Sequence, residues 1–323
     1  MTPSSASPAS GSLRKLGASD LEVFPLCLGG NVFGWTADET ASFAVLDAYT
    51  DAGGNFVDTA DAYTAWIEGH QGGESETVIG KWVKERGNRA DVVIATKVSQ
   101  HPEYPGLSGA NIKAAADASL RRLGTDYIDL YYTHFDQPEI PVEEIIGALE
   151  ELVRAGKVRH IAASNITAER LQESLDFSDR EGLARYVALQ PHYNLVSRDT
   201  YEGALQELAS RTGLAAVPYF ALAAGFLTGK YRPGATVDSA RAGRAAQYLE
   251  TERGPKVLAA LDEIAEAHSV AVPTVALAWL AAQPTVTAPI ASARSLEQLP
   301  ALLAVADLEL TEQELNRLTA ASA

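Results

Sequence analysis

Short apolar runs alternate with longer amphipathic stretches along most of the chain, which predicts strands that alternate with helices. Residues 128–134 form a near-continuous apolar and aromatic run, as expected of a strand buried on both faces of a parallel sheet. Residues 142–155 show helical periodicity that stops at Gly156, a residue type common just beyond helix ends. Eight strand–helix units of this kind favour an α/β fold with one parallel sheet. The expected strands are 26–28, 55–58, 92–97, 128–134, 158–164, 187–190, 214–219 and 286–290, and the expected helices are 40–52, 74–86, 109–123, 142–155, one that starts at Thr167, 200–211, 255–269, 273–282, 295–304 and 311–320.

Three segments fall outside this repeat. Residues 13–23 turn around 17–20 and predict a small β-hairpin, whereas 220–254 is a Gly-, Arg- and Ala-rich connection of the length typical of functional loops. Residues 1–11 are rich in Ser, Ala and Pro and lack the basic and apolar regions of a signal peptide, which predicts a disordered tail. We therefore expect a single domain over residues 12–323.

A parallel sheet of this size can stay open or close into a barrel. The open dinucleotide-binding sheet carries G-x-G-x-x-G after its first strand, whereas residues 29–34 are Gly-Gly-Asn-Val-Phe-Gly. The sequence therefore favours a (β/α)8, or TIM, barrel with an N-terminal β-hairpin cap and an extended loop after strand 7.

Composition narrows the function classes. The 323 residues carry a formal net charge of −16 and no Lys or Arg run, which argues against nucleic-acid binding, and no stretch approaches the about 20 apolar residues of a membrane span. The single cysteine, Cys27, rules out an intramolecular disulfide and fits a reducing compartment, so we expect a cytoplasmic protein. The acidity also means that a phosphorylated cofactor needs a local basic site. Monomer and homo-oligomer both remain open.

Chemically active side chains gather at the ends of neighbouring strands. Asp58, Lys97 and His134 end the second, third and fourth expected strands, and Tyr63 follows Asp58 by one turn of loop. Barrel enzymes carry their reactive residues at this carboxyl end. A lysine at the mouth of an apolar strand is unfavourable unless it is paired, and Asp58 is the available partner. We expect these four residues to form one catalytic site.

The four residue types suit carbonyl reduction. Addition of hydride to a carbonyl carbon leaves an alkoxide, which needs a proton donor and stabilisation of negative charge. The pKa of a tyrosine is about 10, and we expect Lys97 to lower it. Asp58 is expected to hold the Lys97 ammonium in place. His134 is expected to donate a hydrogen bond to the carbonyl oxygen.

Each of these residues alone has an ordinary structural explanation, but their combination favours a catalytic one. Two other hypotheses stay open. One is a non-catalytic regulatory subunit that binds cofactor as a redox sensor on the same fold, and the other is a lyase or aldolase that uses Lys97 as a Schiff-base nucleophile. The histidines show no metal-ligand spacing, so no metal site is expected.

Segments 58–63, 95–97, 129–134 and 225–231 (Asp-Thr-Ala-Asp-Ala-Tyr, Ala-Thr-Lys, Asp-Leu-Tyr-Tyr-Thr-His and Gly-Phe-Leu-Thr-Gly-Lys-Tyr) together resemble the aldo-keto reductase superfamily. The resemblance implies a barrel capped by an N-terminal hairpin, no metal, and hydride transfer from the C4 atom of a nicotinamide. It also implies that Tyr63 is the acid, that Lys97 and Asp58 tune it, and that His134 orients the substrate.

The same resemblance implies a set of cofactor-binding residues. Ser164, Asn165 and Gln190 would hold the carboxamide, and Tyr219 would stack on the nicotinamide. The residues that would clamp the pyrophosphate are Leu227, Gly229 and Lys230, and those that would bind the adenosine phosphate are Ser292, Arg294 and Gln298. Arg294 suits a 2′-phosphate, and Ser295 is expected to open a helix whose N-terminal amides favour an anion. The expected cofactor is NADPH, with NADH as a weaker alternative.

Aromatic residues in the expected strand–helix loops suggest a substrate pocket. An apolar or aromatic aldehyde or ketone would suit them, and a sugar stacked on an aromatic ring is the alternative. The candidate pocket residues are Trp35, Trp66, Tyr104, Phe135 and Tyr193.

Overall fold

The computed structural model describes residues 13–232, 234 and 242–323, so the predicted tail over 1–11 lies outside it. The main sheet has eight strands, and every pairing within it is parallel. Their order is β11-β10-β9-β8-β5-β4-β3-β12. The strands are β3 Cys27–Gly29, β4 Phe56–Asp58, β5 Val93–Val98, β8 Ile128–Thr133, β9 Val158–Ser164, β10 Tyr186–Gln190, β11 Ala215–Ala216 and β12 Ile290–Ala291.

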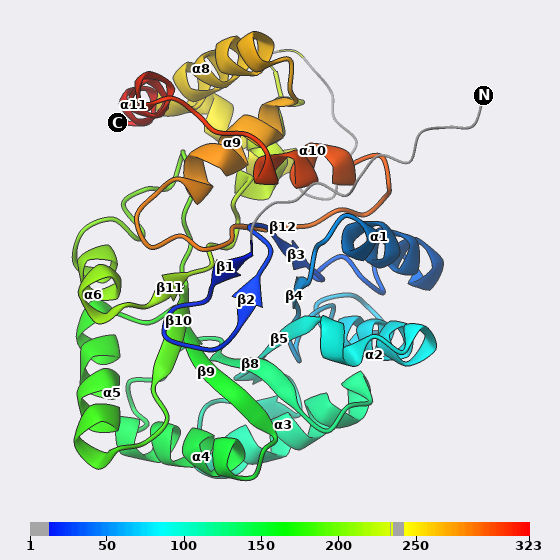
Figure 1. Ribbon diagram of the computed structural model, residues 1–323, viewed down its shortest axis with the longest axis vertical. Coiled ribbons are helices and arrows are strands. Elements are labelled where there is room, and N and C mark those ends of the chain that lie inside the picture. Colours follow the sequence, from blue (N-terminus) through cyan, green and yellow to red (C-terminus); the bar gives the residue numbers. More distant parts are fainter. Residues whose placement is uncertain (1–12, 233, 235–241) are drawn as a thin grey trace.

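The first and last strands of this order meet, and the sheet closes. Ala216 of β11 forms a parallel bridge with Val286, and the Thr287 N–H donates to the Ala216 carbonyl at 2.9 Å. The same segment reaches β3 at its other side, where Ile290 pairs with Cys27. The helices that follow β3 to β11 lie around the outside of the ring (Figure 1). The predicted (β/α)8 barrel is confirmed.

The helices begin and end close to where capping signals predict them. The Asp38 side chain caps the first helix through the Ala41 N–H, and Gly124, at φ +63°, ends the third. The helices are α1 Glu39–Asp51, α2 Glu74–Arg86, α3 Gly109–Leu123, α4 Val142–Arg154, α5 Ala168–Glu181, α6 Ala204–Thr212, α7 Ala242–Ala246, α8 Arg253–His268, α9 Val272–Ala281, α10 Leu299–Leu303 and α11 Glu312–Ala321, with 3-10 turns η1 Arg89–Asp91, η2 Ala223–Thr228, η3 Gln247–Glu250 and η4 Ala304–Ala306.

The N-terminal hairpin closes one end of the barrel, as predicted. Its strands, β1 Arg14–Lys15 and β2 Glu22–Val23, pair antiparallel. Leu16, Leu21 and Val23 are buried in the cluster of side chains that fills the barrel interior. Figure 1 shows this hairpin in the centre of the ring. Because the hairpin fills this end, the opposite, carboxyl end of the strands is the one left for a site.

Two predicted helices begin later than expected. The helix predicted over 200–211 begins at Ala204, because Gly203 has a φ of +95° that no helix accepts. The helix predicted over 295–304 begins at Leu299 and has five residues, since Pro300 suits a first turn and the residues before it form a turn. The expectation of an anion site at a helix opened by Ser295 is therefore wrong.

The long connection after β11 is partly helical, with η2, α7 and η3 in its described part. A small antiparallel hairpin, β6 Gln100–His101 with β7 Tyr104–Pro105, follows β5 and was not predicted. In the described part of the chain, no single helix is long and apolar enough to span a bilayer. Only α8 and α9 together reach that length, and they are bent by 100°.

Candidate active site

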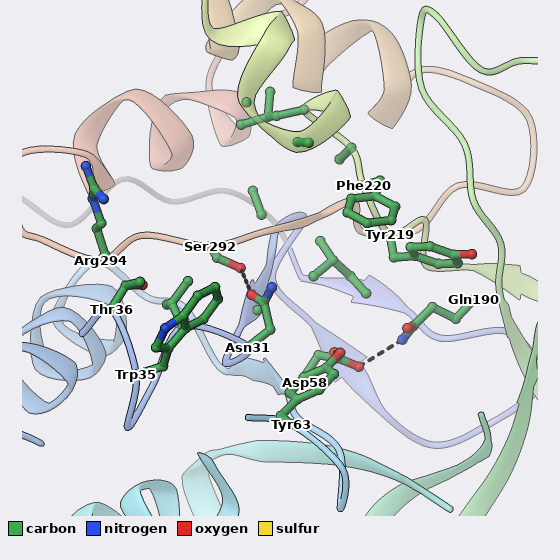
Figure 2. A pocket seen from close by; sticks show the side chains of 18 of the residues that line it. Asn31, Trp35, Thr36, Asp58, Tyr63, Gln190, Tyr219, Phe220, Ser292 and Arg294 are labelled. Atoms are coloured by element: carbon green, nitrogen blue, oxygen red, sulfur yellow. Dashed lines mark hydrogen bonds between the residues drawn. The ribbon is translucent and has the colours of Figure 1, made fainter. Parts of the chain in front are cut away.

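A cleft of about 990 Å³ opens at the carboxyl end of the barrel. Its lining comes from the ends of β3, β4, β9 and β10, from the loops after β8 and β11, and from β12 with the residues that follow it (Figure 2). The sequence-predicted residues that line it are Trp35, Asp58, Tyr63, Trp66, His134, Phe135, Ser164, Asn165, Gln190, Tyr219, Lys230, Ser292, Arg294 and Gln298.

Lys97 forms the centre of a hydrogen-bonded cluster at the base of this cleft. Its side chain is fully buried, and Nζ donates to Asp58 Oδ2 at 2.7 Å, to the Thr59 carbonyl at 2.7 Å and to the Tyr63 hydroxyl at 2.9 Å. Gln190 Nε2 donates to the other Asp58 oxygen at 2.8 Å. The strand ends thus bring the predicted residues together. An amine bound to three acceptors and absent from the cleft lining is poorly placed to attack a substrate, which argues against a Schiff-base lysine.

The Tyr63 hydroxyl has two charged neighbours with opposite effects. It lies 3.2 Å from Asp58 Oδ2, to which it donates, and 2.9 Å from Lys97 Nζ. Burial raises the pKa of Tyr63 well above its usual range, and the Asp58 carboxylate raises it further. The pKa of Tyr63 is therefore raised overall and not lowered as expected, although the Lys97 ammonium beside the hydroxyl favours the phenolate. The phenol is held protonated, ready to act as a proton donor.

His134 lies beside Tyr63, with their ring centroids 6.2 Å apart. Burial lowers the pKa of His134 well below its usual range, and the nearby Lys97 ammonium lowers it further. The imidazole is therefore neutral at pH 7 and carries a single N–H. Its Nδ1 atom is buried and has no hydrogen-bond partner among the described residues.

Polar side chains at the ends of β9 and β10 form a second group across the cleft. Asn165 Nδ2 donates to the His134 carbonyl at 2.7 Å and to Ser164 Oγ at 3.0 Å. The Tyr219 hydroxyl donates to Asn165 Oδ1 at 2.7 Å, and its ring lines the cleft. Amides and hydroxyls fixed beside an aromatic face can hold a planar carboxamide-bearing ring.

The far end of the cleft is basic. Arg294 lies there and Lys230 also lines the cleft, and neither forms an ion pair with a described residue. Among the described residues, the one carboxylate in the lining is Asp58, and it is paired with Lys97. Within a chain of net charge −16, this end supplies the local basic site that a phosphorylated cofactor requires. Figure 2 shows Arg294 at the opposite end of the cleft from Asp58 and Tyr63.

Besides Lys97, which lies at the base, four predicted site residues lie outside the cleft lining. Tyr193 is fully buried, donates to Glu202 at 2.7 Å and packs on Trp279, so it belongs to the core. Tyr104 lies in β7 and packs on His101. Their assignment to the substrate pocket is wrong, because loop membership does not set the direction of a side chain. Leu227 and Gly229 lie in and just after η2, whereas the residues of that segment that face the cleft are Ala224, Gly225, Thr228 and Lys230.

Sequence reasoning missed the contribution of the turn after β3. Asn31 Oδ1 accepts from Ser292 Oγ at 2.6 Å, which joins the first strand end to the last (Figure 2). Thr36 lines the cleft close to Arg294. A Cβ on Gly29 would lie 2.5 Å from Ser292 Oγ, so only glycine permits this approach. The Gly-Gly-Asn sequence at the end of β3 is the feature of the sequence that could have indicated this close approach.

Aromatic rings form the outer rim of the cleft. Trp66 packs edge-on against both Trp35 and Tyr63, with centroids 5.9 and 6.2 Å apart. Phe135 lies over His134 at 5.1 Å. Trp66 is 55% exposed and Phe135 is 43% exposed, so both present apolar surface at the mouth of the cleft.

Asp61 lies in the same loop as Tyr63 and faces the interior. It is fully buried, and neither carboxyl oxygen has a hydrogen-bond partner among the described residues. Burial raises the pKa of Asp61 well above its usual range, and the nearby Glu76 carboxylate adds to this shift. The Asp61 carboxyl therefore remains neutral as the pH rises past the value at which an exposed aspartate ionises.

This predicts a pH-dependent stability difference in an Asp61→Asn variant. Asp61 stabilises the fold fully below the unfolded-state pKa of about 3.9, and this contribution is lost at about 1.4 kcal/mol per pH unit as the pH rises towards the folded-state pKa. Asparagine cannot ionise, so the free energy of unfolding measured in urea should be higher for the variant than for the wild type by a margin that grows from pH 5 to pH 8. The exposed Asp126→Asn change is the control. A difference that stays constant with pH would contradict a neutral Asp61.

Comparison with known proteins supports one family. The model described as "Aldo/keto reductase family" matches residues 25–323. The chain is 33% identical to Protein tas of Escherichia coli (strain K12) over 330 residues, which cover 94% of this chain and 95% of that protein. It is 34% identical to norsolorinic acid reductase stcV of Emericella nidulans (91% and 77% covered) and 31% identical to an aryl-alcohol dehydrogenase [NADP(+)] of Phanerodontia chrysosporium (92% and 82% covered). The chain therefore belongs to the aldo/keto reductase family and is an oxidoreductase.

Proposed function

We propose that this protein reduces aldehydes or ketones to alcohols with NADPH and that Tyr63 donates the proton. The observation that carries the proposal is the Tyr63–Lys97–Asp58 cluster at the base of a cleft whose far end is basic. A proton donor and phosphate-binding side chains thus share one cavity long enough for a dinucleotide. The relatives named for reductase and NADP(+)-dependent dehydrogenase activities agree with this assignment.

A nicotinamide nucleotide bound in the cleft would supply a hydride to the carbonyl carbon. As charge develops on the carbonyl oxygen, the Tyr63 hydroxyl gives it a proton and becomes a phenolate. An alkoxide is a stronger base than a phenolate, so the proton moves even from a phenol of raised pKa. Lys97 Nζ, 2.9 Å from the Tyr63 oxygen, stabilises the phenolate, and Asp58 keeps the amine in place.

His134 orients the carbonyl. Because its imidazole is neutral, it can donate one hydrogen bond to the carbonyl oxygen without competing with Tyr63 as an acid. The ring packs against Tyr63, so both side chains can donate to a carbonyl oxygen at the same place in the cleft. Two donors that converge on one oxygen fix the face of the carbonyl that the hydride reaches.

The residues on the opposite side of the cleft suit the cofactor. Ser164, Asn165 and Gln190 would hold the carboxamide, and Tyr219 would stack on the nicotinamide ring. Lys230 would bind the pyrophosphate, and Arg294 the 2′-phosphate that distinguishes NADPH from NADH.

An Arg294→Ala variant tests the cofactor preference. We expect the Kd for NADPH to rise about tenfold to a hundredfold, because a charge-assisted contact to phosphate contributes about 1.5–3 kcal/mol, while the Kd for NADH changes little. Titration of each nucleotide by fluorescence measures both constants. Arg121→Ala, an exposed arginine on α3, is the matched control. Equal increases in Kd for the two nucleotides would contradict a contact between Arg294 and the 2′-phosphate.

The aromatic rim favours apolar or aromatic carbonyl substrates. Trp35, Trp66 and Phe135 offer flat surfaces at the mouth of the cleft. Two relatives are named for an aryl alcohol and for norsolorinic acid. A screen that follows NADPH absorbance against aromatic and aliphatic aldehydes, ketones and sugars tests both the reaction and this preference. Tight nucleotide binding without turnover of any carbonyl would instead favour the redox-sensor hypothesis.

A further inference from the structure

The residue after Tyr63 has a backbone conformation that threonine rarely adopts. Thr64 is fully buried and has a φ of +75°, in the left-handed region where a Cβ branch crowds the backbone. Residues persist in such conformations only where their surroundings hold them. The contacts of Thr64 therefore bear directly on where Tyr63 lies.

Glu74, the first residue of α2, supplies these contacts. One carboxylate oxygen, Oε2, accepts from the Thr64 hydroxyl and from the Gly72 N–H at 3.0 Å, and Oε1 accepts from the Gln71 N–H at 2.8 Å. Burial by itself raises the pKa of Glu74, but the hydrogen bonds from Thr64 and Gln71 lower it below its usual range. A single carboxylate thus joins both ends of the loop that carries Tyr63.

The Tyr63 side chain is held by Lys97, Asp58 and His134, but the main chain beside it has few other contacts. The Tyr63 N–H makes only a long hydrogen bond, 3.3 Å, to the Ala60 carbonyl. Its ring packs on Trp66, which belongs to the same loop and is largely exposed. The Thr64 carbonyl accepts from the Ile67 N–H at 2.9 Å, which starts the next turn. The bond between Thr64 and Glu74 therefore ties the chain next to Tyr63 to the first residue of α2, while the bond from Thr59 to Ser75 ties the start of the loop to the same helix.

We infer that Glu74 is a positioning residue for Tyr63, because its carboxylate holds Thr64 in the left-handed conformation and so keeps the Tyr63 hydroxyl in line with the carbonyl oxygen. The inference rests on the proposed function, in which Tyr63 donates the proton. Misplacement of a proton donor weakens the reaction step and not the binding of ligands. The effect therefore belongs to kcat and not to KM.

A Glu74→Gln variant tests this role, because glutamine keeps the shape but replaces one acceptor oxygen by a donor. We expect kcat for an aromatic aldehyde to fall about tenfold, with KM and the Kd for NADPH within about twofold. Amide hydrogen exchange over residues 60–73 should become faster. Glu68→Gln, an exposed change in the same loop with no hydrogen bond to a described residue, should alter neither readout.

Replacement of Thr64 separates positioning from a general loss of structure. Thr64→Val keeps the branched Cβ but lacks the hydroxyl, so we expect the same loss of kcat. Thr64→Gly adopts a positive φ without strain, so Glu74→Gln should lower kcat less than about threefold in that background. Thr64→Val also remains a test if Glu74→Gln does not fold.

The outcomes distinguish this inference from the proposed function. Wild-type kcat in both Glu74→Gln and Thr64→Val, with Tyr63→Phe inactive, would overturn the positioning role alone. The same tenfold loss from Glu74→Gln with and without Thr64→Gly would also overturn it, because the conformation of residue 64 would then be irrelevant. Full activity of Tyr63→Phe would overturn the proposed function itself.

Discussion

A Tyr63→Phe variant should lose carbonyl reduction by about 10³-fold or more in kcat while it still binds NADPH. Removal of the hydroxyl takes away the proton donor, and general acid catalysis contributes about 10²–10⁴-fold in rate. The ring, its packing on Trp66 and its place in the cleft wall remain. Fluorescence titration of NADPH and turnover of an aromatic aldehyde measure the two halves of this expectation.

The control for this variant is a hydrogen-bonded tyrosine outside the cleft. Tyr193 is fully buried and hydrogen-bonded to Glu202, so Tyr193→Phe also removes a buried hydroxyl but leaves the reacting groups untouched. We expect this control to keep kcat within about twofold while it loses some stability. Wild-type turnover in Tyr63→Phe would show that another group, or water, protonates the product.

A Lys97→Met variant should lose both activity and stability. Lys97 and Asp58 form a fully buried ion pair, and removal of one partner leaves the Asp58 charge without its counter-ion. Breaking such a pair destabilises proteins by about 3–5 kcal/mol. The Tyr63 phenolate would also lose the cation that stabilises it, so we expect kcat to fall at least about a hundredfold. Urea unfolding and single-turnover kinetics measure these effects.

The second change Asp58→Asn separates the two losses. In the double variant, Lys97→Met with Asp58→Asn, the buried charge is gone, so we expect the free energy of unfolding to recover in part. Turnover should not recover, because the phenolate still lacks its counter-ion. Strictly additive destabilisation by the two changes would contradict the ion pair as the source of the stability loss.

The elements predicted best are those with strong local signals at both ends. Helices 74–86 and 109–123 have the predicted bounds, since glycine follows each and apolar residues recur at helical spacing. The strand over 158–164 is likewise as predicted. The late start of α10 and of α6 shows the limit of periodicity, because Pro300 and Gly203 decided those ends.

The candidate site likewise contains residues that local sequence patterns predict and contacts that they do not. Asp58, Lys97 and His134 could be found because each lies within one residue of a strand end, and parallel strands of a barrel end at one face. Tyr104 and Tyr193 were misassigned because residues in loops obey no simple period. The bond between Ser292 and Asn31 could not be predicted, since it joins residues at opposite ends of the chain.

By itself, the sequence determined the alternation of strands and helices and the residue types at the strand ends. It favoured a barrel because the motif of the open dinucleotide-binding sheet is absent after the first strand. These features depend on neighbours along the chain. Only the tertiary structure decided which loop aromatics face the cleft, that the pKa of Tyr63 is raised rather than lowered, and that Glu74 holds Thr64 in place. These properties depend on burial and on contacts between distant segments, which exist only once the chain has folded.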